Sequence, residues 1–256
     1  MKTLTAFMKK EFLEHLRSGR LVILGLLFLL LGVMNPAVAK LTPWLFEVMA
    51  DDLAQSGMVL TPVTITAMDS WVQFFKNIPI GLIAFVLLES SIFTKEYQSS
   101  TLVLSLTKGL PRWQVVAAKS AMLLLLWTAG YWLCYGVTWG YNAYFWDNAV
   151  AQDLTSAAAY WWLFGLWTVA LLTFFSALAS ANTGALAGTG CVVLASYLSG
   201  LFPKLARYSP TALTGSNALI HGTAQSADCM PAVLIAILTG AACFAGAVAV
   251  FNRRRL

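Results

Sequence analysis

The sequence has 256 residues, of which 59% are hydrophobic and only 11% charged. A soluble domain normally carries about a quarter charged residues, so a soluble globular fold is excluded. The net charge of +5 needs no nucleic-acid partner, because it is explained by the basic residues that fix the topology of a membrane protein and that contact anionic lipid.

Residues 1–20 predict an amphipathic helix that lies in the membrane interface. Apolar residues recur at three- and four-residue spacings, namely Leu4, Phe7, Met8, Phe12, Leu13 and Leu16. Ser18 and Gly19 supply a corner into the next segment. A solvated basic tail is the alternative. A cleaved signal peptide is disfavoured, because this twenty-residue segment contains Glu11 and Glu14 and is unlike a short basic leader.

Six membrane spans follow, because a bilayer crossing needs about 20 apolar helical residues. Residues 21–39, 120–146, 154–203 and 229–252 contain no Asp, Glu, Lys, Arg or His, and 154–203 is long enough for two crossings with a turn at 180–184. A further span requires that Lys76 reaches outward and that Glu89 is tolerated inside the protein. The predicted fold is therefore all-α and polytopic, one domain over residues 1–256, with spans at about 21–39, 71–93, 116–144, 157–180, 184–203 and 231–251.

The predicted outer loops differ in character. The first, at about 40–70, contains a stretch at 43–57 typical of a short surface helix. The last, residues 204–230, is only moderately polar and is expected to pack back on the bundle. Gly184 and Gly188 in the fifth span allow close helix approach, either within the chain or at a dimer interface.

The basic residues predict the orientation, since cytoplasmic loops carry an excess of Lys and Arg. With both termini cytoplasmic, the inner side holds twelve of them and the outer side four, which are Lys40, Lys76, Lys204 and Arg207. The protein is thus expected to be a multi-pass protein of the cell membrane.

Several kinds of chemistry are excluded by missing motifs. The sequence has no GxxxxGK[ST] loop and no HExxH motif, so neither P-loop ATP binding nor a zinc metalloprotease is expected. The four cysteines are scattered, and no metal site is predicted. Glu89 is the acidic residue well inside a predicted span, and it is expected to pair with Lys95 or a neighbouring helix rather than with a His or a second acid.

Residues 93–119, "FTKEYQSSTLVLSLTKGLPRWQVVAAK", resemble the cytoplasmic loop of type-2 ABC exporter permeases. Glu96, Thr101–Leu102, Pro111–Arg112 and Lys119 follow the family order of an acid, a small-residue step, a short helix, a Pro, a base and a Lys. Ser100 stands where the family commonly has Gly. The segment "KKEFLEHLRSGRLVILGLLFLLLG" is similar to the interfacial helix and first span of these permeases.

The resemblance implies that residues 94–115 form a cytoplasmic coupling segment whose short helix docks on a separate ABC ATPase subunit. Its candidate coupling residues are Thr101, which belongs to the family pattern, Leu102, Leu104 and Leu106 as apolar anchors, and Lys108 and Arg112 as rim contacts. The chain itself would bind no cofactor and catalyse no reaction, because ATP and Mg²⁺ belong to the partner ATPase. An ordinary basic loop that fixes topology is the alternative.

The resemblance also implies a bacterial exporter of two permease copies, identical or paralogous, and two ATPases. The translocation route would lie between the permeases, along the first, second and fifth spans, with Phe74, Phe75 and Glu89 as candidate lining residues. An apolar route suits a hydrophobic or amphipathic cargo such as a peptide or drug. The alternatives are a secondary transporter driven by an ion gradient and a non-transporting immunity or sensor component of the membrane.

Overall fold

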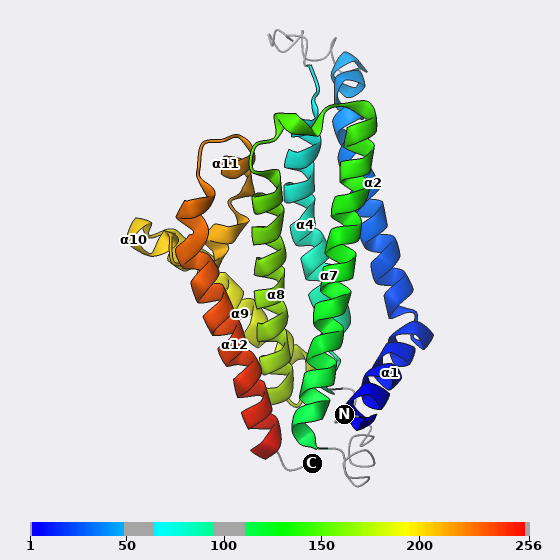
Figure 1. Ribbon diagram of the computed structural model, residues 1–256, viewed down its shortest axis with the longest axis vertical. Coiled ribbons are helices and arrows are strands. Elements are labelled where there is room, and N and C mark those ends of the chain that lie inside the picture. The colour runs from blue at the N-terminus through cyan, green and yellow to red at the C-terminus, as the bar shows by residue number, and fades with distance from the viewer. Residues whose placement is uncertain (1, 49–63, 95–110, 254–256) are drawn as a thin grey trace.

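The computed structural model describes residues 2–48, 64–94 and 111–253. Six helices in these ranges are long and apolar enough to cross a membrane, which confirms the predicted all-α polytopic fold. They are α2 (Arg20–Val48), α4 (Ala67–Glu89), α7 (Arg112–Phe145), α8 (Leu154–Leu178), α9 (Asn182–Gly200) and α12 (Met230–Arg253). The N-terminal helix α1 (Lys2–Arg17) lies obliquely at one end of the bundle, which is also where α12 ends (Figure 1). We call this the terminal end.

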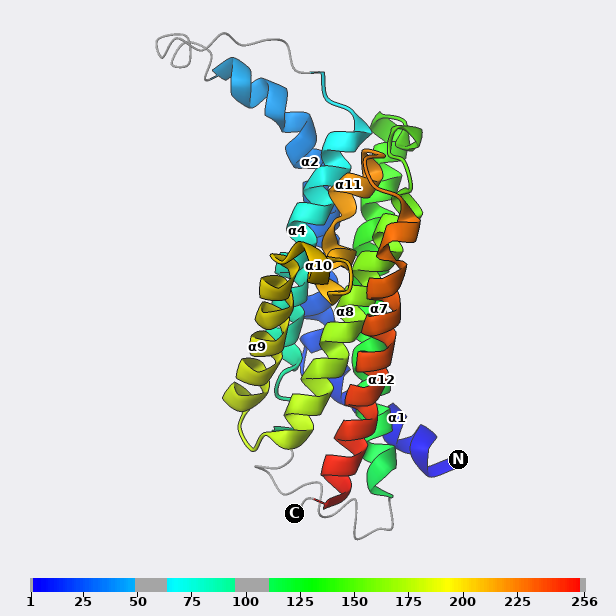
Figure 2. The same cartoon turned by 90° about the vertical axis from the view of Figure 1, so that its left-hand side faces the viewer.

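The spans form two groups, which meet where α7 contacts α8. On one side α2 packs against α4 and α7, and on the other α8 packs against α9 and α12. Figure 2 shows α9 and α7 on opposite sides of the bundle. At the end away from the termini, η2 (Pro210–Thr214) and α11 (Ser216–Ile220) pack back on α8 and bury Leu213, Leu219 and Ile220. Three further short helices contact other spans, namely η1 (Asn148–Val150) on α4 and α7, α10 (Pro203–Ala206) on α9, and η3 (Ser226–Cys229) on α12.

The first span is longer than predicted. Helix α2 continues to Val48 although it contains Pro36 and Pro43, so the predicted end at 39 and the separate helix starting at 43 are wrong. A proline lacks the N–H that would bond the carbonyl four residues earlier. For Pro36 that carbonyl belongs to Gly32, and Thr138 of α7 donates its hydroxyl to it at 3.0 Å. A tertiary contact thus replaces the missing helical bond.

The limits of other spans also differ from the predicted ones by about one helical turn or less. Helix α4 begins at Ala67 rather than 71, because Thr66 and Asp69 form a capping box there. It ends at Glu89 rather than 93. Helix α7 begins at Arg112, directly after Pro111. The 95–110 segment is therefore preceded by the turn that follows α4 and is followed by the start of α7.

Large aromatic side chains fill the core between α2, α4, α7 and α8. A Cβ added at Gly165 of α8 would lie 2.1 Å from the Trp127 indole of α7, and one added at Gly130 would lie 2.5 Å from the Phe28 ring. These glycines let the rings approach the helix backbones, which is how small residues stabilise packing in membranes. The bundle that carries the terminal end is therefore tightly packed.

Candidate functional site

Helix α1 turns a polar face toward the bundle. Phe7, Glu11 and His15 recur every fourth residue, and all three side chains are buried. Phe12, Leu13 and Leu16 are 46%, 39% and 41% exposed on the outer side of the same helix. The amphipathic helix expected from the sequence is present, but part of its apolar surface faces outward and two ionisable residues face inward.

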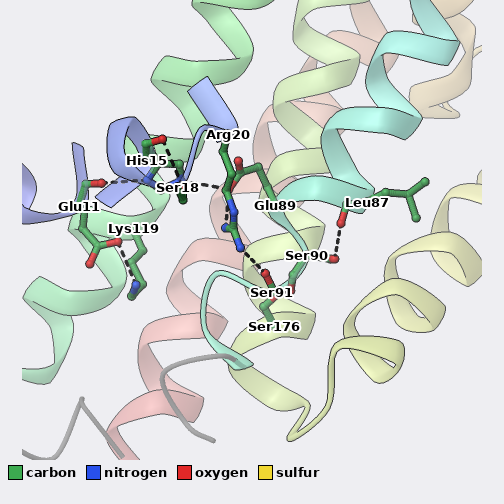
Figure 3. A network of polar contacts seen from close by, with 10 residues as sticks. All are labelled: Glu11, His15, Ser18, Arg20, Leu87, Glu89, Ser90, Ser91, Lys119 and Ser176. Atoms are coloured by element: carbon green, nitrogen blue, oxygen red, sulfur yellow. Dashed lines mark hydrogen bonds and ion pairs between the residues drawn. The ribbon is translucent and has the colours of Figure 1, made fainter. Parts of the chain in front are cut away.

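The elbow between α1 and α2 fixes this orientation. Gly19 has φ 72°, a left-handed conformation that glycine adopts without a steric penalty. The chain therefore turns between Arg17 and Arg20 within two residues. Arg20 begins α2 directly beside the inner face of α1, where Figure 3 shows it next to His15 and Glu89.

Glu11 forms a buried ion pair with α7. The Nζ atom of Lys119 donates to its Oε2 at 3.0 Å, and each side chain is 2% exposed. Lys10 adds a more exposed contact to the Oε1 of Glu11 at 3.2 Å. A buried carboxylate is tolerated only when its charge is paired, so Lys119 is what allows Glu11 to face the bundle.

Glu89, fully buried at the end of α4, pairs with both α1 and α2. Its Oε2 lies 3.1 Å from Nε2 of His15 and 3.6 Å from Nη1 of Arg20 (Figure 3). Arg20 also donates through Nη2 to the Ser91 hydroxyl at 2.8 Å. The expectation that Glu89 has no His partner is wrong, because the interfacial helix supplies one.

The contacts of His15 define its protonation. Its Nδ1 lies 2.9 Å from the carbonyl oxygen of Glu11, and a carbonyl only accepts, so Nδ1 carries a proton. A protonated Nε2 would donate to Oε2 of Glu89 on the other side of the ring. Burial opposes the charged ring, but the hydrogen bonds to Glu89 and Glu11 outweigh it, and the pKa of His15 is raised above 6.5. His15 is therefore a cationic link between α1 and α4 when it is protonated.

The cluster contains a buried acceptor without a hydrogen bond and adjoins a small cavity. Within the described ranges, Oε1 of Glu89 is buried and accepts no hydrogen bond. A cavity of about 20 Å³ adjoins Glu11, Glu14, His15, Arg20 and Lys119; by volume it has room for one water molecule. The residues the structure describes contain no group of three or more His, Cys, Asp or Glu suited to a metal. The arrangement is thus a joint between helices, with a titratable member.

Arg112 connects the start of α7 to the end of α12. Its Nη1 donates to the carbonyl oxygens of Phe251 and Asn252, both at 3.2 Å. Basic groups commonly bond the last carbonyls of a helix in this way. The Phe93 ring lies 6.1 Å from that of Phe251 and 5.7 Å from Nζ of Lys119. The two ends of the 95–110 segment are thereby both tied to the bundle.

The other predicted site residues have varied positions. Thr101, Leu102, Leu104, Leu106 and Lys108 lie outside the described residues. Phe74 and Phe75 are buried inside the chain, where Phe74 contacts Tyr131 and Tyr135 of α7. Gly188 faces Phe175 of α8, whose ring would lie 2.3 Å from an added Cβ, whereas Gly184 is exposed. Gly188 therefore packs within the chain, and neither a translocation nor a dimer role is tested.

Sequence reasoning missed that Glu11, His15, Arg20 and Lys119 join Glu89 in one cluster. A signal was present, because Phe7, Glu11 and His15 share a helix face at i, i+4 and i+8. Two ionisable residues on a helix face that also carries Phe7 indicate buried partners. The partners themselves come from three other helices and could not be located from spacing.

Comparisons with known proteins cover nearly the whole chain. Residues 5–254 match the family described as "ABC-2 family transporter protein". The chain is 24% identical over 239 residues to the "Uncharacterized transmembrane protein YxlG" of Bacillus subtilis (strain 168), with 87% of each protein covered. No solved structure matches.

Proposed function

Because the chain belongs to the ABC-2 family of transporter proteins, we propose that it is the permease of an ATP-driven exporter whose ATPase docks on residues 95–110. The buried ion cluster is the observation that carries this proposal. Glu89 and Ser91 precede the segment, Lys119 follows it, and all three contact α1 or Arg20. A force on the segment would therefore reach α1, α2, α4 and α7 together.

The cluster suggests how ATP binding moves the spans. Docked ATPases that approach each other would displace the 95–110 segment and, with it, the ends of α4 and α7. Buried ion pairs resist separation, because removing one partner leaves an uncompensated charge. The helices joined by the pairs would then move as a unit, and the bundle would alternate between two states.

The orientation that this mechanism requires is supported by charge. Lys9, Lys10, Arg17, Arg112 and Arg253 all belong to helix segments at the terminal end. By the positive-inside rule this end is cytoplasmic, where an ATPase has access to ATP and Mg²⁺. The permease would then lie in a bacterial cell membrane with both termini inside.

A second permease copy is supported by the exposure of α9. The buried residues of this span are Ala185, Thr189 and Ser196. Of the residues in its most apolar 18-residue stretch, 11% are buried by the rest of the chain, against 67% for α8. A helix covered so little has most of its surface available to lipid or to another copy. We propose that α9, with Gly184 at its start, faces the second permease across the route.

The cargo that fits this chain is hydrophobic or amphipathic, such as a peptide or drug. Among the described residues of α4, Lys76 is exposed, and the other exposed positions of the helix are apolar. Phe74, Phe75 and Glu89 are buried in the single chain, so lining a route between copies would require helices to move apart. They would meet cargo only in the open state.

One observation favours a second candidate function. The contact between His15 and Glu89 is a titratable pair of the kind that proton-driven transporters use. Such transporters, however, hold their ion site near the bilayer midplane, and this pair lies at the terminal end of α4. ATP-driven export is therefore the better supported function, and a non-transporting immunity or sensor component would share its docking segment.

Co-purification tests the docking proposal. We expect the tagged chain to retain an ABC ATPase from the membranes of its source cells, identified by mass spectrometry. Changing Leu102, Leu104 and Leu106 together to Asp is expected to remove it, because charges replace the apolar anchors. Leu53→Asp with Leu60→Asp, in the segment that joins α2 to α4, is the matched control. Retention of the ATPase by the triple variant refutes docking through this segment.

Vesicle transport separates the functions. In reconstituted vesicles that contain the ATPase, cargo uptake is expected to require ATP and to persist when an ionophore collapses the proton gradient. Uptake driven by a gradient without ATP would establish the secondary transporter instead. An ATPase complex that moves none of a panel of amphipathic peptides and hydrophobic drugs would indicate a sensor or immunity role.

A further inference from the structure

An apolar groove lies where α1, α2 and α7 meet. It has a volume of about 370 Å³, and its walls include Phe12 of α1, Leu24 and Gly25 of α2, and Leu125, Ala129 and Leu133 of α7. It is open toward the exterior of the bundle, since Phe12, Leu125 and Leu133 are all exposed. The groove is separate from the ion cluster, because the two lie on different faces of α1.

The length of the groove matches one leaflet. Its lining on α7 runs from Met122 to Leu133, which corresponds to about 16 Å at 1.5 Å per residue. The hydrocarbon core of a bilayer is about 30 Å thick, so one leaflet contributes about half of that. The groove therefore begins beside the interfacial helix and ends close to the bilayer centre.

Gly25 leaves the groove hollow. A Cβ added at this position would meet no atom within 4 Å, although Gly25 lies between the buried Leu24 and the lining of α7. Here the missing side chain creates open space rather than close helix packing, unlike Gly130 or Gly165. The hollow lies where an acyl chain would run along α2.

A basic side chain shares the helix face that forms the mouth. Lys9 precedes the lining residue Phe12 by three residues, so the two lie on one face of α1. Arg17 lines a separate hollow with Lys10 and Glu14. Lys9 is exposed on α1. A headgroup phosphate at the level of an interfacial helix would meet this cation, which contributes to binding an anionic lipid.

We propose that this groove binds an anionic phospholipid of the leaflet at the terminal end, with one acyl chain along Gly25 and α7 and the phosphate at Lys9. A second copy of the chain is the other occupant to consider. The groove, however, includes α7, and Figure 2 shows α7 on the side of the bundle opposite to the exposed helix α9. The choice of a lipid over a second copy rests on the dimer face proposed at α9, and lipid binding itself does not require the exporter function.

Native mass spectrometry of the purified chain in detergent tests the site, with dioleoyl phosphatidylglycerol and dioleoyl phosphatidylcholine as probes. The unaltered chain is expected to bind phosphatidylglycerol more tightly. Gly25→Leu is expected to weaken phosphatidylglycerol binding by about tenfold or more, because the new side chain displaces several methylenes of the acyl chain. Lys9→Gln is expected to weaken phosphatidylglycerol binding by about fivefold and to leave phosphatidylcholine binding unchanged.

Gly140→Leu is the matched control, since an added Cβ there also meets no atom within 4 Å and the site lies seven residues beyond the end of the groove. This variant is expected to bind both lipids as the unaltered chain does. Equal binding of the two lipids, or unaltered binding by Gly25→Leu, overturns the proposal. Loss of a dimer in Gly25→Leu without loss of lipid would assign the groove to a second copy. If Gly25→Leu fails to fold, the Lys9 variant decides.

Discussion

Two polar clusters hold the same three spans together, and they are built differently. At the terminal end, α2, α4 and α7 meet α1 through charged groups, with Glu11, Glu89 and Lys119 almost fully buried. Nearer the middle of the spans the same helices meet through neutral groups. There Asn35 of α2 donates to Thr138 of α7 at 3.1 Å and accepts from Asn77 of α4 at 2.9 Å.

The neutral cluster has a structural explanation. Thr138 donates to the Gly32 carbonyl that Pro36 leaves without a helical partner, and Asn35 fills the remaining capacity of the Thr138 hydroxyl. In a bilayer an unsatisfied carbonyl is costly, and neighbouring side chains commonly supply the bond that a proline removes. The donors and acceptors of this cluster are therefore explained by one break in one helix.

The charged cluster is not explained in this way. It lies at the elbow between α1 and α2 and at the end of α4 rather than at a proline within a helix, and Oε1 of Glu89 is left without a hydrogen bond among the described residues. Apolar residues of similar volume would often be as stable as a buried ion pair. The neutral cluster therefore maintains the fold, whereas the charged cluster fits the coupling role proposed for it above.

The largest effect is expected from Lys119→Met. This change leaves the Glu11 carboxylate facing the bundle without its buried cation, and breaking a buried pair costs about 3 to 5 kcal/mol of unfolding free energy. The double variant Glu11→Leu, Lys119→Met is expected to recover most of that loss, because it removes both members of the pair and leaves neither charge without its partner. Unfolding in detergent by increasing denaturant measures both.

Lys76→Met is the control for that experiment, since Lys76 is an exposed lysine of α4. Its effect should stay within about 0.5 kcal/mol, as for other surface changes. If Lys119→Met were as mild as this control, the ion pair would contribute little, and the distinction between the two clusters would fail.

A smaller effect is expected from Thr138→Val, which keeps the volume of the side chain and removes its hydroxyl. The loss of hydrogen bonds between membrane helices averages about 0.6 kcal/mol and reaches about 1.7 kcal/mol. In a Pro36→Ala background the backbone N–H returns and can bond Gly32, so the cost of Thr138→Val should shrink. An equal cost in both backgrounds would show that the hydroxyl does not compensate for the proline.

The sequence predicted the spans but not the clusters, for a physical reason. Apolar runs such as 154–203 report burial in lipid directly, and the six spans followed from them. Helix limits depended on local features that the runs do not reveal, such as Pro36 inside α2 and the cap at Thr66. Glu89 was recognisable as costly, yet its partners His15 and Arg20 are more than sixty residues away. Only the tertiary packing of α1 brings them together.

The smallest expected effect concerns the pH dependence of the unfolding free energy, which distinguishes the two clusters. The pKa of His15 is raised above 6.5 in the folded chain, so folding favours its protonated form. Its contribution to stability is full below pH 6.5 and is lost as pH rises through the folded pKa. The groups that face it are Glu11 and Glu14 of α1, Arg20, Glu89 and Lys119.

Relative to His15→Gln, the unaltered chain should therefore lose unfolding free energy between neutral and alkaline pH. The cost of Thr138→Val should not change over the same range, because the neutral cluster contains no group that titrates there. Parallel pH profiles for the unaltered chain and His15→Gln would mean that His15 does not carry the charge that links α1 to Glu89.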